Sequence, residues 1–156
     1  DLTSGKLAGA DVFVSADMAG DVVVWDAASL TVKARLTKAI GDTCTSIAVA
    51  GDFIACGYGS GHIRLFNAAG EKAVEIAAHC RWLQALAYDP KTNLLASVGE
   101  DQQLLIWKCP TAADKKVALK GQKVMKDCLL TGVQFTGDGK VAAAAYDNER
   151  LSVFSV

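Results

Sequence analysis

The sequence predicts an all-β protein built from four-stranded antiparallel sheets that follow one another along the chain. Its apolar runs are four to seven residues long, which is typical of strands and too short for ordinary helices. Glycine, aspartate, asparagine or proline bounds the runs, as expected where a chain turns between strands. The runs also recur about every 41 residues, so the chain repeats one kind of sheet.

An aromatic residue near the end of an apolar strand marks the repeat. This strand occurs four times, as DVVVWD (21–26), HIRLFN (62–67), QLLIWK (103–108) and RLSVFS (150–155). The aromatic residues are separated by 41, 41 and 47 residues. A second apolar run precedes each copy across a short polar turn, at 11–16, 52–57, 93–98 and 140–145. Each pair therefore reads as the central hairpin of a sheet.

Two further strands complete each predicted sheet. Inner strands are expected at 44–49, 82–88 and 129–135, whereas residues 1–10 leave room for only a truncated one. Outer strands with alternating polarity, typical of a half-exposed edge, are expected at 30–36, 72–77 and 115–120. Four strands in a period of about 40–45 residues are the signature of a β-propeller.

The chain holds between three and a half and four such units, at approximately 1–38, 39–79, 80–126 and 127–156. The last unit ends on its third strand, and closed propellers have about four to eight blades. We therefore expect the C-terminal part of a ring of about seven blades. An open part would leave apolar sheet faces uncovered, so it should pair with the missing N-terminal half or with a second copy as a homodimer. A complete four-bladed ring is the less favoured alternative.

Composition excludes several other classes of protein. Apolar residues make up 51% of the chain, and 16 Lys and Arg against 17 Asp and Glu leave a net charge of −1. This balance argues against binding to nucleic acid or to a membrane surface, and no apolar stretch approaches the ~20 residues of a membrane span. Five cysteines without a CxxC pair argue against a disulfide framework, and with no secretory signal they favour a reducing, cytoplasmic location.

The repeats resemble those of the WD-repeat family over nearly the whole chain. Trp25-Asp26 is the dipeptide that names the family, and diverged forms are Phe66-Asn67, Trp107-Lys108 and Phe154-Ser155. Ala78-His79 stands where the family has Gly-His. More narrowly, segments 56–70 and 97–108 and the terminal RLSVFSV resemble the C-terminal half of one member.

The resemblance implies a buried hydrogen-bond network in the third unit. Its members are His79, Ser97, Asp101 and Trp107, and its purpose is to satisfy polar groups inside a packed sheet. At the aspartate position the other units have Ala19, Ser60 and Asn148. We expect those units to rely more on apolar packing.

The resemblance also implies a partner-binding face, formed by the turns between second and third strands and the entries to first strands. The matching residues are Met18, Thr43, Gly59, Cys80, Arg81, Trp82, Glu100 and Asp147. Arg81 and Trp82 are favoured because arginine and tryptophan are enriched at binding hot spots. The alternative for Trp82 is a buried position that packs against the next sheet.

Chemical sites are less favoured than structural roles. Ser97, His79 and Asp101 have the residue types of a hydrolase triad, but Ser97 falls within a strand beside its expected partner Trp107. Segment 57–61 (GYGSG) resembles a phosphate loop, but no helix follows it. His79-Cys80 with Cys109 lacks the spacing of a metal site, so neither a metal nor a cofactor is expected. The lysines between 115 and 126 are more typical of a protected sheet edge than of an acidic-partner site.

The predicted function is a non-catalytic scaffold that binds protein partners through propeller loops. The alternative is a small-molecule, peptide or enzymatic site in the central channel of the complete ring. Thr45, Gln84 and Thr131 lie near the strand starts that would face this channel, and none of them is ionisable, which weakens the alternative.

Overall fold

The computed structural model describes residues 1–36, 41–146 and 148–156, and within these ranges all regular structure is β-strand. The first sheet contains β1 (Leu2–Leu7), β2 (Ala10–Ala16), β3 (Val22–Asp26) and β4 (Val32–Leu36). The second contains β5 (Cys44–Ala50), β6 (Phe53–Tyr58), β7 (His62–Asn67) and β8 (Lys72–Ala77). The third contains β9 (Leu83–Asp89), β10 (Leu94–Gly99), β11 (Gln103–Lys108) and β12 (Ala118–Val124). The fourth contains β13 (Leu130–Phe135), β14 (Lys140–Ala145) and β15 (Ser152–Ser155).

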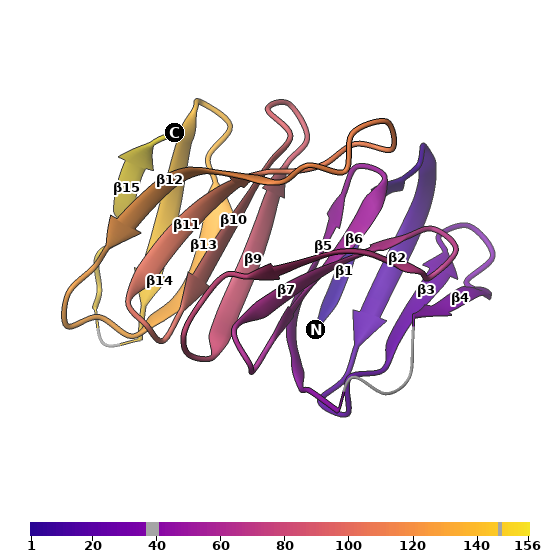
Figure 1. The fold of residues 1–156 in the computed structure, drawn as a ribbon, viewed down its shortest axis with the longest axis horizontal. Coiled ribbons are helices and arrows are strands. Elements are labelled where there is room, and N and C mark those ends of the chain that lie inside the picture. Colours follow the sequence, from indigo (N-terminus) through magenta and orange to yellow (C-terminus); the bar gives the residue numbers. More distant parts are fainter. Residues whose placement is uncertain (37–40, 147) are drawn as a thin grey trace.

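Every sheet is an antiparallel meander in which consecutive strands pair. The sheets stand side by side, from the fourth at one end to the first at the other, and the ring is not closed (Figure 1). This confirms the predicted all-β propeller fold. No helix in the described ranges is long and apolar enough to cross a membrane.

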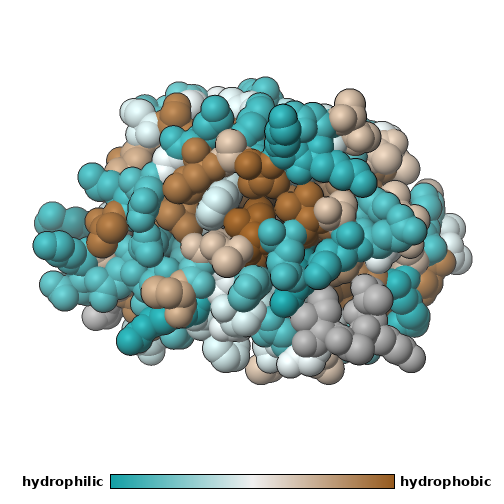
Figure 2. All heavy atoms as spheres, in the orientation of Figure 1, coloured by the Kyte–Doolittle hydropathy of each residue, from teal (hydrophilic) through white to brown (hydrophobic). Residues whose placement is uncertain are grey.

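Three apolar clusters join neighbouring sheets. Val14 and Val24 of the first sheet pack with Ile54 of the second, Leu65 of the second packs with Leu95 of the third, and a corresponding cluster joins the third and fourth. Strand β6 is buried along its whole length, which explains why its sequence is apolar on both faces. Hydrophobic atoms also gather on the surface between β8 and β12, inside a hydrophilic surround (Figure 2).

Two expectations about strand length were wrong. Residues 1–10 do not form a truncated strand, because β1 pairs with β2 in an unbroken register from Leu2↔Ser15 to Leu7↔Ala10. The outer strand of the third sheet begins at Ala118 rather than at 115, and it extends to Val124. The polar segment before Ala118 forms turns instead, in which the Thr111 amide donates to the Asp114 carbonyl. The alternating polarity of residues 115–120 did not mark the true start of this strand, because the start is set by its pairing with β11, which begins at Lys108↔Ala118.

Candidate functional site

A buried hydrogen-bond chain crosses the third sheet. The Asp101 carboxylate lies 2.8 Å from His79 Nδ1, and His79 Nε2 lies 2.9 Å from the Ser97 hydroxyl. Trp107 Nε1 donates to the same hydroxyl at 3.0 Å. The second carboxylate oxygen of Asp101 accepts from the Cys80 amide, which attaches the chain to the loop before β9. The four residues that the resemblance singles out are thus in mutual contact.

The neutral form of His79 suits this arrangement. Neutral imidazole donates from Nδ1 to Asp101 and accepts the Ser97 proton at Nε2, so each donor meets an acceptor. Burial lowers the pKa of His79, and the neighbouring Asp101 carboxylate only partly opposes this effect. Burial conversely raises the pKa of Asp101, but the interaction with His79 and the hydrogen bonds from the Cys80 and Gln103 amides together outweigh it, so the net direction is down.

The Asp–His–Ser order resembles a catalytic triad, but the surroundings do not suit a nucleophile. Ser97 is 0% exposed, and its oxygen already accepts the Trp107 indole proton. A substrate carbonyl therefore has no path to the hydroxyl. Within the described ranges, no group of three or more His, Cys, Asp or Glu side chains is arranged to hold a metal ion.

The same positions in the other sheets change together. In the first sheet Trp25 Nε1 donates to Ser15 at 3.0 Å, so the tryptophan–serine pair is kept. In the second sheet both partners are replaced, by Phe66 and Cys56, and both are buried in the apolar cluster. The tryptophan and the serine are replaced together because either one alone would leave a buried indole N–H or hydroxyl without a hydrogen-bond partner.

The second sheet contains a polar cluster instead, so the expectation that it relies on apolar packing was incomplete. The Arg64 guanidinium donates to Asp42 at 3.1 Å and to Glu75 at 2.7 Å, and it lies 4.4 Å from the centre of the Tyr58 ring. Ser60, at the family's aspartate position, donates its hydroxyl to Asp42. Burial works against ionised Asp42, but Ser60 and Arg64 outweigh it and lower its pKa. The sequence signal that could have revealed this cluster is an arginine inside the otherwise apolar strand HIRLFN.

A surface hollow of about 500 Å³ lies where the first three sheets meet at their turn-bearing edge. Three predicted contact residues from three different sheets line it: Met18, Thr43 and Trp82. The predicted channel residues Thr45 and Gln84 line it too, whereas Thr131 does not. The remaining lining residues are Asp1, Ala16, Asp17 and Cys44. We call this feature the three-sheet hollow.

Backbone hydrogen bonds hold the three-sheet hollow in shape. The Gly59 amide donates to the Thr43 carbonyl, and the Glu100 amide donates to the Trp82 carbonyl, both at 2.9 Å. Gln84 Nε2 donates to the Glu100 carboxylate at 3.1 Å. Each entry to an inner strand is therefore tied to the neighbouring turn, and the surface is preorganised.

Trp82 both packs against the neighbouring sheet and remains accessible. Three atoms of its six-membered ring lie 3.3 Å from the point where a Cβ on Gly59 would stand, so the ring rests on the Gly59 backbone. The side chain is nevertheless 39% exposed. Gly59, predicted as a contact residue, thus supports Trp82.

The other predicted contact residues lie around the hollow or outside the described ranges. Cys80 and Arg81 are exposed beside Trp82 in the loop before β9, and Glu100 reaches the hollow through Gln84. Asp147 lies outside the described residues. Sequence reasoning missed Asp17, whose carboxylate accepts from the Ala19 and Asp21 amides and shapes the turn that carries Met18.

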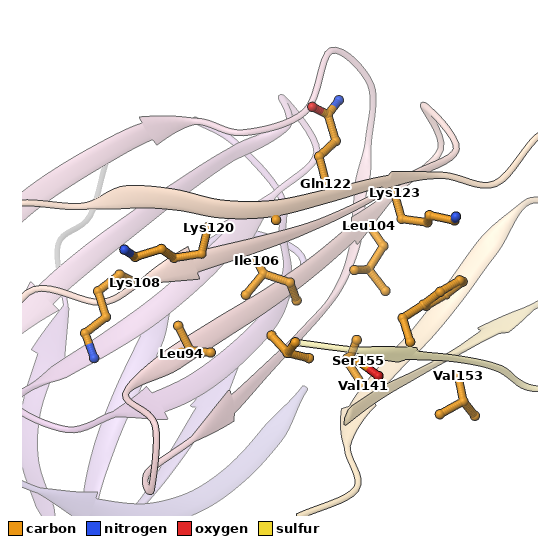
Figure 3. A pocket seen from close by; sticks show the side chains of 13 residues that line it. Leu94, Leu104, Ile106, Lys108, Lys120, Gln122, Lys123, Val141, Val153 and Ser155 are labelled. Carbon is orange, nitrogen blue, oxygen red and sulfur yellow. The ribbon is translucent and has the colours of Figure 1, made fainter. Parts of the chain in front are cut away.

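A second concave feature, a groove of about 800 Å³, lies between the third and fourth sheets. Leu104 and Ile106 form its floor, and Lys120 and Lys123 of β12 overhang one side (Figure 3). Its other side is β15, which pairs only with β14 among the described residues. We call it the β15 groove.

The outward face of the first sheet is also apolar and uncovered. Phe13 and Trp25 line a shallow hollow there with the exposed Leu2 and Leu30. Trp107, at the matching position of the third sheet, is only 9% exposed because the second sheet covers it. The first sheet thus presents the surface that a preceding sheet would cover.

Comparison with known proteins agrees with these features. The WDR54 family model matches residues 2–156. WD repeat domain 54 of Rattus norvegicus is 30% identical over 141 residues, and WD repeat-containing protein 54 of Homo sapiens is 31% identical over 149 residues. These matches cover 86% and 91% of this chain but 42% and 44% of the relatives, so the chain spans less than half of their length. The chain belongs to the WDR54 family of WD-repeat proteins.

Proposed function

We propose that the chain is part of a non-catalytic scaffold that binds a protein partner at the three-sheet hollow. Membership of a WD-repeat family indicates a protein-interaction scaffold in general. The observation that supports the finer proposal is the meeting of Met18, Thr43 and Trp82, from three sheets, in one preorganised hollow. Partly exposed tryptophan on a rigid support is the side chain most enriched at binding hot spots. The occupied, inaccessible Ser97 hydroxyl supports the non-catalytic part of the proposal.

Photo-crosslinking tests the proposal at the hollow itself. A photoreactive amino acid replaces Met18, which is 77% exposed, in the full-length protein inside cells. We expect irradiation to yield discrete covalent adducts with other proteins. The matched control replaces Lys91, an exposed residue in the turn at the opposite edge of the third sheet, and it should give none of these adducts. Equal adducts from both positions, or adducts that survive Trp82→Ala, would contradict the proposal.

We also propose that the rest of the longer protein completes the sheet at β15 and covers the first sheet. Two observations support this: the β15 edge borders an apolar groove, and Trp25 lacks the cover that Trp107 has. The matched relatives are about twice as long as this chain, which favours the N-terminal half of a longer protein over a second copy as the occupant. An unpaired strand edge is a template for a further strand, so the segment should add in an extended form.

Hydrogen exchange distinguishes these occupants of the β15 groove. In the full-length protein we expect peptides that contain β15 to exchange slowly, because the edge is paired. In residues 1–156 alone they should exchange fast, with a solution mass of 16.3 kDa. Slow exchange in the fragment at about twice that mass would favour the homodimer, and slow exchange in a monomeric fragment would indicate a closed small ring.

A further inference from the structure

Charge is segregated in this molecule although the net charge is only −1. Around the three-sheet hollow, the described side chains that carry charge are mainly carboxylates: Asp17 lines it, Asp21 belongs to the same turn, and Glu100 reaches it through Gln84. Arg81 is the neighbouring cation, and it is not a lining residue. Lysines instead gather on and beside the outer strand β12, at the other side of the third sheet.

The carboxylates near the hollow differ in how far they are already engaged. Asp101 is engaged by His79, and Asp42 by Arg64 and Ser60. Asp17, by contrast, is exposed, and only its Oδ1 accepts hydrogen bonds, from two backbone amides. Its negative charge is therefore not neutralised by any ion pair within the described residues.

The apolar part of the hollow faces solvent between these charges. Met18 is 77% and Trp82 39% exposed, and they approach the hollow from different sheets. Methionine adapts its shape to an incoming side chain, whereas the indole is held flat on Gly59. One wall of the hollow is thus adaptable and the other is rigid.

We propose that the three-sheet hollow takes a basic segment of the partner protein, with one apolar side chain seated between Met18 and Trp82 and lysine or arginine side chains directed to Asp17 and Glu100. The inference rests on the proposed function and adds the chemistry of the partner. A cationic segment complements the carboxylates around the hollow, although Arg81 beside it carries a like charge. An acidic segment would place like charges together, which opposes binding.

A random-peptide library displayed on phage and selected on the full-length protein tests this chemistry. We expect the selected peptides to share lysine or arginine within a few residues of one large apolar residue. Trp82→Ala should weaken a representative synthetic peptide about tenfold or more. Asp17→Asn with Glu100→Gln should weaken it about threefold or more, and so should about 0.5 M salt.

Matched variants separate the hollow from the rest of the surface. Asp138→Asn removes an exposed carboxylate in the β13–β14 turn, at the opposite edge, and should leave binding unchanged. Gly59→Ala disturbs the seat of Trp82 without changing charge and should weaken binding at unchanged salt dependence. Selected peptides that are neutral or acidic, or whose binding ignores the two carboxylate variants, would overturn the inference. If such peptides still depend on Trp82, the proposed scaffold function stands. If no peptide depends on Met18 or Trp82 and Met18 forms no adducts, the proposed function fails together with the inference.

Discussion

Replacing Ser97 by alanine is expected to lower the free energy of unfolding by about 3 kcal/mol, because two buried groups lose one partner. Trp107 Nε1 would keep its proton without an acceptor, and His79 Nε2 would lose its donor. Ser97 is 0% exposed, so bulk water does not reach the site to replace the hydroxyl. Urea denaturation of the full-length protein, followed by circular dichroism, measures the loss.

Ser97→Thr is the matched control, because it keeps the hydroxyl and suits a strand. We expect it to cost about 1 kcal/mol, because the added methyl group must fit into a packed sheet. A loss from Ser97→Ala as small as that of the threonine variant would show that the network contributes little to the fold.

The stability that this network contributes should depend on pH, and the lowered pKa of His79 sets the direction. Its pKa is lowered in the folded state, mainly by burial, from the ordinary value of 6.5. As the pH falls below 6.5, the unfolded chain binds a proton that the folded chain does not. The free energy of unfolding should therefore decrease below this pH and level off below the folded-state pKa, until the lowered pKa of Asp101 adds a further loss at stronger acidity. The His79→Gln variant should be less stable at neutral pH, and its free energy of unfolding should change less with pH below 6.5.

Gly61→Ala is expected to be the most damaging small substitution in the second sheet, with a loss of about 3 kcal/mol or more. Gly61 has φ +82°, which alanine adopts only under strain. An added Cβ would also stand 2.2 Å from the His79 carbonyl oxygen and 2.7 Å from that of Arg81. Backbone rather than a flexible side chain would have to move, and this movement would disturb the hydrogen bond that the His79 amide donates to the Gly61 carbonyl.

Gly137 is the matched control, because it has the backbone strain without the steric contact. It has nearly the same backbone angle, φ +86°, but an added Cβ would meet no atom within 4 Å. Gly137→Ala should cost about 1 kcal/mol, from backbone strain alone. The urea midpoints of the Gly61→Ala and Gly137→Ala variants should therefore differ. The difference measures the cost of the close approach between the second and third sheets at Gly61. Equal losses would contradict that explanation.

Much of the fold could be predicted because its signals are local. Strand β11 shows this: its continuous apolar run and its bounding turns are contained in the chain around QLLIWK, and its distance from the other copies can be counted along the sequence. The prediction of β12 was less accurate, because nearly all of its residues are exposed and its start depends on pairing with β11. Strand β1 was underestimated because its exposed positions make it look unlike the other inner strands.

The candidate site was only partly predictable. The resemblance placed Met18, Thr43 and Trp82 on one edge, but it did not show that they line one hollow, that Gly59 supports the indole, or that Asp17 belongs with them. Arg64 was overlooked because its partners Asp42 and Glu75 lie 22 and 11 residues away.

The sequence by itself determined the kind of unit and its repetition, and the family resemblance added the four hydrogen-bonding side chains of the third sheet. Those properties depend on alternation, turn residues and spacing, which are set within one repeat. Only the tertiary structure decided which surfaces meet: the hollow between three sheets, the groove beside β15 and the uncovered Trp25. The reason is physical. Contacts between sheets depend on how whole faces pack against each other, and side chains tens of residues apart become neighbours only when that packing is complete.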